Sequence, residues 1–405
     1  MANSLNTSSL VSKRMVQVLH AKSMISGTVN NSYSKDLTQR NYAPGDTISI
    51  DIVHQPSVTQ NRVATVQDVK NRTVSATILQ YNAAEKWSSI VKRYDMTSEK
   101  GVIQYTDDMS KRMIREVDRT SLEYMAKQAS NSVGTPGVDS GSLRTYAEGV
   151  AKIDDALGGQ TEDCFAAVNP MGHVALTDSL KGLQNPGKEI SNQYLRYRMK
   201  NAAGINFYKS NSVSRWTKGT ATNSTPVMNG ATTSGASTIS IDGLSAATAT
   251  ITEKTHFTIA DVYAVDPETK TTLSYLKDFS VTATATGSGS AIAALAISPT
   301  IYDSTSPHQN VSALPADGAA LTLSIDSTSA AANIIYDRDA YTLISVPLPP
   351  AAGGVHKFAQ TENGIQIRTG FGSWDAVEDK QIFRIDAVWV MAKLREDHSC
   401  KVWGA

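Results

Sequence analysis

The sequence predicts an α+β fold that carries an inserted all-β domain, and three observations lead to this prediction. A long amphipathic stretch, residues 105–131, contains no glycine or proline and predicts one long helix. Alternation of apolar and polar residues over 43–53 and 381–394 predicts half-buried strands. Near residue 220 the composition changes to one dominated by Thr, Ser, Ala and Gly, and it returns to normal after residue 332.

Composition excludes several classes of protein. The 405 residues include 38 basic and 38 acidic side chains, which argues against a protein held mainly by phosphate contacts. Cys164 and Cys400 are too far apart in sequence for a disulfide framework or a zinc motif, and they suit a reducing compartment. No apolar run approaches the ~18 residues of a membrane span. We therefore expect a soluble protein of several units, made in the cytoplasm, with no contact to a membrane.

The N-terminal region predicts an amphipathic helix over 9–26, with Gly27 as its end. Lys13, Arg14 and Lys22 lie opposite the apolar stripe of this helix. Two interpretations stay open: an arm packed on its own chain with a solvated basic face, or an arm whose basic face binds a partner.

A polar stretch, 54–72, separates the strand over 43–53 from a second strand over 73–81. A strand, a long polar segment and another strand predict a projecting hairpin. Arg62, Lys70 and Arg72 on this segment are either solvent-facing charges or salt-bridge donors to a neighbouring subunit.

The helix over 105–131 is expected to form a structural spine, with Met109, Met113, Val117 and Tyr124 on its apolar stripe. At ~1.5 Å per residue such a helix is about twice the ordinary length. Three shorter elements should follow: a helix near 142–157, a buried strand over 164–170 and a short helix over 171–184.

The segment 221–332 contains three basic and nine acidic residues, so it carries −6 and the remainder of the chain +6. Short alternating stretches separated by turn residues predict an all-β module. Residues 211–219 and 333–341 flank the insert and should be adjacent strands of one sheet.

After the insert, residues 364–370 predict a strand, 371–380 a long hairpin tip and 381–394 a long returning strand. Five apolar residues should line one face of this last strand: Phe383, Ile385, Ala387, Trp389 and Met391.

No catalytic pattern is present in the sequence. The seven histidines form no metal-ligand motif, no G-x-S-x-G elbow occurs, and the paired glycines at 287–290 do not precede a phosphate-binding helix. The sequence therefore predicts neither an enzyme nor a cofactor or metal site.

Several stretches resemble a known family. KTHFTIADVYAVDPETKTTLSYLKDFSVTATAT (254–286) with AISPTIY (296–302) resembles the inserted domain of the P-twenty-two-type tailed-phage coat proteins. NIIYDRDAYTLISVPLPP (333–350) and RIDAVWVMAKLREDHSCKVWG (384–404) are similar to the segments that follow that domain. GDTISIDI (45–52) and VNP (168–170) match more weakly.

The resemblance implies the Johnson fold of tailed-phage and herpesvirus capsids and a major capsid protein that forms pentamers and hexamers around double-stranded DNA. It implies these parts: an N-terminal arm (1–35), an extended loop (36–82), a peripheral domain with the spine helix (83–141), an axial domain (142–221 and 333–362), an inserted β domain (222–332) and peripheral and C-terminal strands (363–405). It also implies a scaffolding protein and a portal as partners. The candidate contacts between subunits or with the scaffold are Lys13, Arg14, Lys22, Arg62, Lys70, Arg72, Trp374, Asp375 and Glu378.

Two other functions fit part of the sequence. A secreted β-rich adhesin would explain the Thr- and Ser-rich insert but leaves the long helix unexplained. A hydrolase with an unrecognised site has no convergent residues to support it. Size-exclusion chromatography separates the three: a megadalton particle, an extended monomer or a small compact oligomer.

Overall fold

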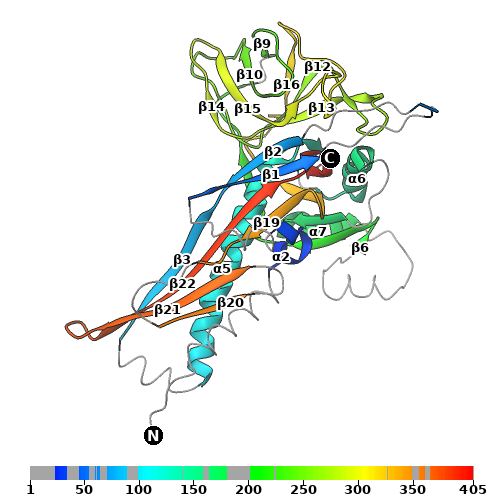
Figure 1. Ribbon diagram of the computed structural model, residues 1–405. Helices are drawn as coiled ribbons and strands as arrows, with labels where there is room; N and C mark the ends of the chain where they lie inside the picture. Colours follow the sequence, from blue (N-terminus) through cyan, green and yellow to red (C-terminus); the bar gives the residue numbers. More distant parts are fainter. Residues whose placement is uncertain are drawn as a thin grey trace. The chain divides into compact units, whose positions relative to one another are not determined.

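The computed structural model describes most of the chain. The described residues are 23–33, 45–53, 60, 62–63, 71–88, 99–138, 140–157, 164–179, 201–222, 225–325, 327–348, 355–360 and 365–404. Figure 1 labels many of their helices and strands. The described residues divide into two compact units, each composed of three segments. Unit 1 comprises Met1–Ile50, Val74–Ser121 and Tyr341–Ala392, and unit 2 comprises Asp51–Thr73, Leu122–Ala340 and Lys393–Ala405.

Unit 1 is built around a five-stranded sheet in which β22 is the longest strand. Its strands are β3 (Leu79–Ser88), β19 (Tyr341–Ser345), β20 (Val355–Gln360), β21 (Gln366–Asp375) and β22 (Lys380–Lys393). The order is β19-β22-β21-β20, and β3 also pairs with β22. β22 therefore has β21 and β3 as antiparallel neighbours, and the ladder to β3 extends over ten residue pairs.

The apolar face of β22 confirms the sequence prediction. Phe383, Ile385, Ala387, Trp389 and Met391 are all buried. On the other face Arg384 is exposed, whereas Asp386 is buried and accepts hydrogen bonds from Arg368 (2.8 Å) and Arg384 (2.7 Å). A carboxylate in the middle of a sheet is tolerated because two guanidinium groups supply its counter-charge.

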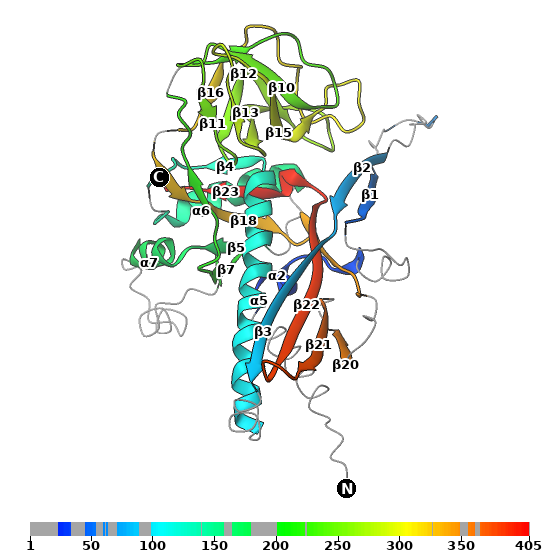
Figure 2. The same ribbon diagram turned by 90° about the vertical axis from the view of Figure 1, so that its left-hand side faces the viewer.

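The long helix α5 spans Glu99–Gln128. The expected range, 105–131, was wrong at both ends. The helix continues through Gly101, a residue that costs only about 1 kcal/mol in a helix interior, and it stops before Asn131–Val133, which forms strand β4. Met109, Met113 and Val117 are buried as predicted. Within unit 1 the helix lies beside the sheet (Figure 2), and Trp389 Nε1 donates to Thr120 Oγ1 at 3.2 Å.

Near the N-terminus the structure describes a single helical turn, α2 (Ile25–Thr28), and two strands, β1 (Thr47–Val53) and β2 (Asn71–Thr77), which form a two-stranded sheet. Most of the helix expected over 9–26 lies outside the described residues. Where it is described the expectation was wrong, because α2 begins at Ile25 and continues through Gly27. In β1, Ile48 and Ile50 are buried and Thr47, Ser49 and Asp51 exposed, which confirms the predicted alternation.

The main sheet of unit 2 has six strands in the order β4-β23-β18-β5-β7-β6. They are β4 (Asn131–Val133), β5 (Cys164–Val168), β6 (Asn201–Ala202), β7 (Ile205–Lys209), β18 (Asn333–Asp337) and β23 (Ser399–Val402). Helix α6 (Leu143–Leu157) packs on this sheet, and the two cysteines lie in the shared core, both as free thiols. Helix α7 (Pro170–Ser179) follows β5, and the last five residues of the helix expected over 171–184 lie outside the described residues.

The insert forms a closed six-stranded antiparallel barrel in the order β16-β12-β13-β15-β10-β9. Its strands are β9 (Val227–Met228), β10 (Ala236–Asp242), β12 (His256–Val265), β13 (Thr272–Val281), β15 (Ile292–Ile301) and β16 (Leu321–Leu323). Three backbone hydrogen bonds close it, from Met228 N to Ala319 O (2.9 Å), from Gly318 N to Met228 O (2.9 Å) and from Leu321 N to Pro226 O (2.8 Å). The interior is a continuous apolar core that includes Phe257 and Phe279.

The two ends of the insert meet at a short ladder outside the barrel. β8 (Arg215–Thr217) pairs with β17 (Ser329–Ala331), and β11 (Thr250–Ile251) pairs with β14 (Ala285–Thr286). The expectation that 211–219 would pair with 333–341 was therefore wrong: β8 pairs with β17, the strand that precedes β18. β18 has both its edges occupied, by β5 and β23, so it has no free edge for β8.

Candidate functional site

The tip of the β21–β22 hairpin is the most exposed predicted contact region that the structure describes. The expected loop over 371–380 is shorter in the structure, because β21 continues to Asp375 and the turn occupies only 376–379. Asp375 Oδ1 accepts the backbone N–H groups of Val377 (2.9 Å) and Glu378 (3.4 Å). This Asx turn fixes the tip and leaves Val377 95% exposed.

The charges at this tip are arranged in a small network. Glu378 Oε2 lies 3.0 Å from Lys380 Nζ and 3.9 Å from Lys86 Nζ. The hydrogen bond and the charge of Lys380, with a further effect of Lys86, hold the pKa of Glu378 below its ordinary value. All three side chains are exposed, so these pairs orient the tip more than they stabilise it.

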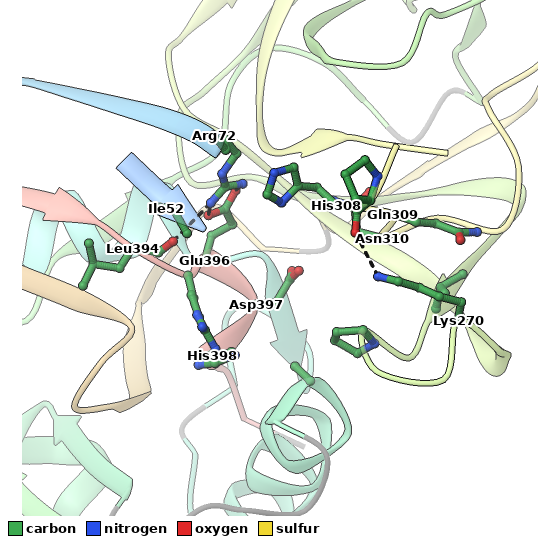
Figure 3. Close-up of a pocket in the computed structure, with 15 residues that line it drawn as sticks. Ile52, Arg72, Lys270, His308, Gln309, Asn310, Leu394, Glu396, Asp397 and His398 are labelled. Atoms are coloured by element: carbon green, nitrogen blue, oxygen red, sulfur yellow. Dashed lines mark hydrogen bonds and ion pairs between the residues drawn. The ribbon is translucent and has the colours of Figure 1, made fainter. Parts of the chain in front are cut away.

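Arg72 has an intrachain role. Its guanidinium donates to both oxygens of Glu396 at 2.9 Å and to the carbonyl of Leu394 at 3.1 Å (Figure 3). Burial by itself would raise the pKa of Glu396, but the charges of Lys393 and Arg72 outweigh it and hold this pKa below its ordinary value. Within its own chain the Arg72 guanidinium is thus already paired with a buried carboxylate.

The other predicted contact residues are less informative. Arg62 is exposed. Lys13, Arg14, Lys22 and Lys70 lie outside the described residues, as does the side chain of Trp374, whose backbone pairs with Gln381.

Unit 2 contains a polar seam where the barrel meets the main sheet, and Asp278 on β13 is its centre. The carboxylate accepts from Ser132 N (3.1 Å) on β4 and from Lys152 Nζ (2.5 Å) on α6, and His256 Nε2 lies 3.1 Å away. Burial alone would raise the pKa of Asp278, but His256 and Lys152 overcome this effect and keep the pKa below its ordinary value. An ionised carboxylate therefore joins the insert to two elements of the main domain.

Two lysines extend this seam. Lys277 Nζ donates to Asp397 Oδ1 at 2.7 Å. Lys401, on β23, is fully buried and donates to Ser280 Oγ (2.7 Å) and to the carbonyl of Lys254 (3.1 Å) in the barrel. Burial lowers the pKa of Lys401 to about 7.

Aromatic side chains complete the seam. The rings of Trp216 and Trp403 are 6.1 Å apart in an edge-on arrangement, and both are buried. Each indole N–H is satisfied, Trp216 Nε1 by Thr255 Oγ1 (3.0 Å) and Trp403 Nε1 by Ser132 Oγ (2.8 Å). The barrel is thus attached by a packed interface as well as by its two chain crossings.

Sequence reasoning missed this seam. The available signal was the scarcity of cations in the insert: of its three lysines, Lys254 and Lys277 are buried. Lysine is almost never fully buried without partners, so a lone lysine next to an aspartate in an apolar strand indicates a contact with another element.

Two other kinds of site are absent from the described part of the chain. None of its groups of His, Cys, Asp and Glu has the arrangement that a metal ion needs. Among the same residues, no helix combines the length and apolar character required to cross a lipid bilayer.

Comparison with known proteins gives the following. Among solved structures, that of Mycobacterium phage Che8 is 9% identical, with 95% of this chain and 93% of the other covered and a TM-score of 0.46. The asymmetric unit of the bacteriophage PhiM1 mature capsid is 13% identical, with 94% of this chain and 86% of the other covered and a TM-score of 0.43. The CUS-3 coat protein I-domain is 28% identical over 25% of this chain and 96% of its own, with a TM-score of 0.19. No curated protein matches.

One family model matches a large part of the chain. It is described as P22 coat protein - gene protein 5, and it covers residues 86–398, which is more than half of the sequence. The matched range contains the whole of α5, the whole barrel and the strands of the two larger sheets except β23 and most of β3. The chain therefore belongs to the P22 coat protein family: it is a major capsid protein with the Johnson fold that self-associates into the shell of a phage virion.

Proposed function

We propose that copies of this one chain occupy both the pentamers and the hexamers of an icosahedral shell that encloses double-stranded DNA, and that the chain has no catalytic role. The observation that carries the proposal is the family match over residues 86–398. Because a single sequence must occupy non-identical positions, its intersubunit contacts are near-equivalent and individually weak. Weak contacts allow wrongly placed subunits to dissociate, while many of them together close a stable shell.

The hairpin tip supports a role in these contacts. Val377 is almost fully exposed, and the tip is ordered by the Asx turn at Asp375. An ordered, exposed tip loses little conformational entropy when its Val377 side chain packs on a neighbour. Glu378 and Trp374 belong to the same proposed contact.

The arm and the extended loop supply further proposed contacts. The basic residues Lys13, Arg14 and Lys22 would bind an acidic surface of a scaffolding protein, and Arg62 and Lys70 would contact an adjacent subunit. A portal would occupy one vertex. Assembly would take place in the cytoplasm of the bacterial host.

Charge supports an orientation for the insert. The insert carries −6 and the rest of the chain +6, so the insert would face outwards, away from DNA.

Electron microscopy and size-exclusion chromatography of the purified chain test the proposal. The expected result is a megadalton icosahedral particle, and a small oligomer under all assembly conditions would contradict it. Val377→Asp tests the tip: it should lower the yield of shells without unfolding the subunit, whereas Val377→Thr, which keeps the shape, should retain most of the yield. Equal yields from the two variants would exclude the tip as a contact.

Charge reversal at Lys13 and Arg14 tests the arm. The doubly reversed chain should fold normally and assemble poorly with scaffold. Normal shells at normal yield would mean that the arm has no charged partner.

A further inference from the structure

Unit 2 contains a cavity of about 120 Å³ beside the barrel (Figure 3). Four parts of the unit line it: the base of the β1–β2 hairpin, the end of α6, two loops of the barrel and the C-terminal segment before β23. At about 30 Å³ per water molecule, the cavity has room for about four waters or for one tetrahedral oxyanion.

The carboxylates that line this cavity already have partners. Both oxygens of Glu396 accept from Arg72. Asp397 Oδ1 accepts from Ser130 Oγ at 2.8 Å and from Lys277 Nζ at 2.7 Å. Both acidic side chains thus already accept hydrogen bonds from groups of their own chain.

The donors, in contrast, are in excess. Arg72 Nε and His398 Nδ1 are buried, and neither has a hydrogen-bond partner in the part of the chain that the structure describes. Arg72 Nε is always a donor, and His398 Nδ1 donates in one of the two tautomers of the neutral imidazole. Lys270 Nζ donates to the carbonyl of Pro307 at 3.2 Å, which uses one of its three protons. A buried donor without an acceptor is destabilising, so this lining favours an occupant that brings oxygen acceptors.

Charge points the same way. The lining has three cationic side chains, Arg72, Lys270 and Arg395, against the two bound carboxylates. Burial lowers the pKa of Lys270 more than nearby Asp266 raises it. A bound anion would offset that cost, because hydrogen bonds between an ammonium and an oxyanion are among the strongest in proteins.

We propose that this cavity binds a small oxyanion, which accepts hydrogen bonds from Lys270, Arg72 and His398. The anion links a barrel loop, the hairpin base and the C-terminal segment, three parts that are far apart in sequence. Its binding therefore stabilises the attachment of the barrel in the unassembled subunit. The same chemistry is available from a free anion such as phosphate and from a carboxylate of a neighbouring chain in the shell.

The test uses inorganic phosphate as the probe and the full-length unassembled chain. Phosphate at ten times its dissociation constant should raise the ratio of folded to unfolded protein about elevenfold, and chloride at equal ionic strength should not. Lys270→Asn removes the charge, and asparagine tolerates the positive φ of 57° at this position. This variant should bind phosphate at least tenfold more weakly, measured by calorimetry and by ³¹P line broadening.

Lys209→Gln is the matched control, since it removes an exposed lysine from β7 that does not line the cavity. It should bind phosphate like the native chain. If both free subunits and assembled shells bind phosphate, the occupant of the cavity is a free anion. If only free subunits bind it, a carboxylate of a neighbouring chain occupies the cavity in the shell. The proposal is overturned if phosphate acts no differently from chloride, or if Lys270→Asn binds it as tightly as the native chain.

Discussion

Replacing Asp278 by asparagine should detach the barrel from the main sheet of unit 2 without unfolding the barrel itself. The substitution keeps the size of the side chain and removes its charge. Asp278 is 4% exposed. Its carboxylate accepts hydrogen bonds from Ser132 N (3.1 Å) and Lys152 Nζ (2.5 Å) and lies 3.1 Å from His256 Nε2. The barrel core contains none of these groups, since it is formed by the apolar residues between the strands.

The expected free-energy cost of the substitution depends on Lys152, whose ammonium loses its counter-charge. Removal of one member of a buried ion pair costs about 3–5 kcal/mol, because the other charge stays uncompensated. Lys152 is 25% exposed, so solvent partly compensates its ammonium. The cost should therefore lie near the lower bound, at about 3 kcal/mol, which corresponds to an increase of roughly 100-fold in the population of the detached form.

Hydrogen exchange measured by mass spectrometry on the unassembled full-length chain is the appropriate assay. The amide of Ser132 donates to Asp278, so its exchange should accelerate by roughly 100-fold in Asp278→Asn, while amides in the centre of β12 and β13 stay protected. Asp261→Asn is the matched control. Asp261 is exposed on the same strand as His256, and asparagine accepts its φ of 61°.

The dependence on pH gives a second check. The pKa of Asp278 is lowered in the folded chain, so its stabilising effect is present above the unfolded value of 3.8 and is lost as the pH falls below that value. The difference between native chain and variant should thus be constant above about pH 5 and shrink in stronger acid. Exchange at Ser132 that stays within threefold of the Asp261→Asn control would refute the assignment of Asp278 as the centre of the seam.

Three further predictions concern single residues. Lys401 has a pKa of about 7 in the folded chain against 10.5 in the unfolded chain, so the unfolded state binds more protons between these two pH values. The free energy of unfolding, measured in urea, should therefore rise from pH 7 to pH 10, and in Lys401→Met this rise should be absent. Trp389→Ala should lower the stability of unit 1 by about 3–5 kcal/mol, because the side chain is 2% exposed and stacks on Tyr81 with centroids 3.8 Å apart; thermal unfolding would show no change if this packing were unimportant. Gly134→Ala should hinder folding of unit 2, measured as soluble yield, because φ is 83° and a Cβ atom would lie 2.5 Å from Trp403 O.

The sequence by itself determined the elements that depend on local periodicity. Alternation identified the buried face of β22, and the helical repeat identified Met109, Met113 and Val117 on α5, because side chains on one face recur every two residues in a strand and every three or four in a helix. Composition identified the inserted β domain and its negative charge. These features need no knowledge of distant contacts.

Element ends were harder to predict. Helix α5 begins before Gly101 and stops before β4, and the tip after β21 is shorter than expected. At such ends the local preferences are weak, and the outcome depends on which partner strand is present.

Only the tertiary structure decided the seam and the partners of its charges. Asp278 meets Lys152 across 126 residues of sequence, and Arg72 meets Glu396 across 324. The partner of β8 likewise depends on β18 being occupied on both edges. A charged residue in a sequence has the same local pattern whether it is solvated or buried, and the difference arises only when the folded chain brings an opposite charge within 3 Å and excludes water from around both.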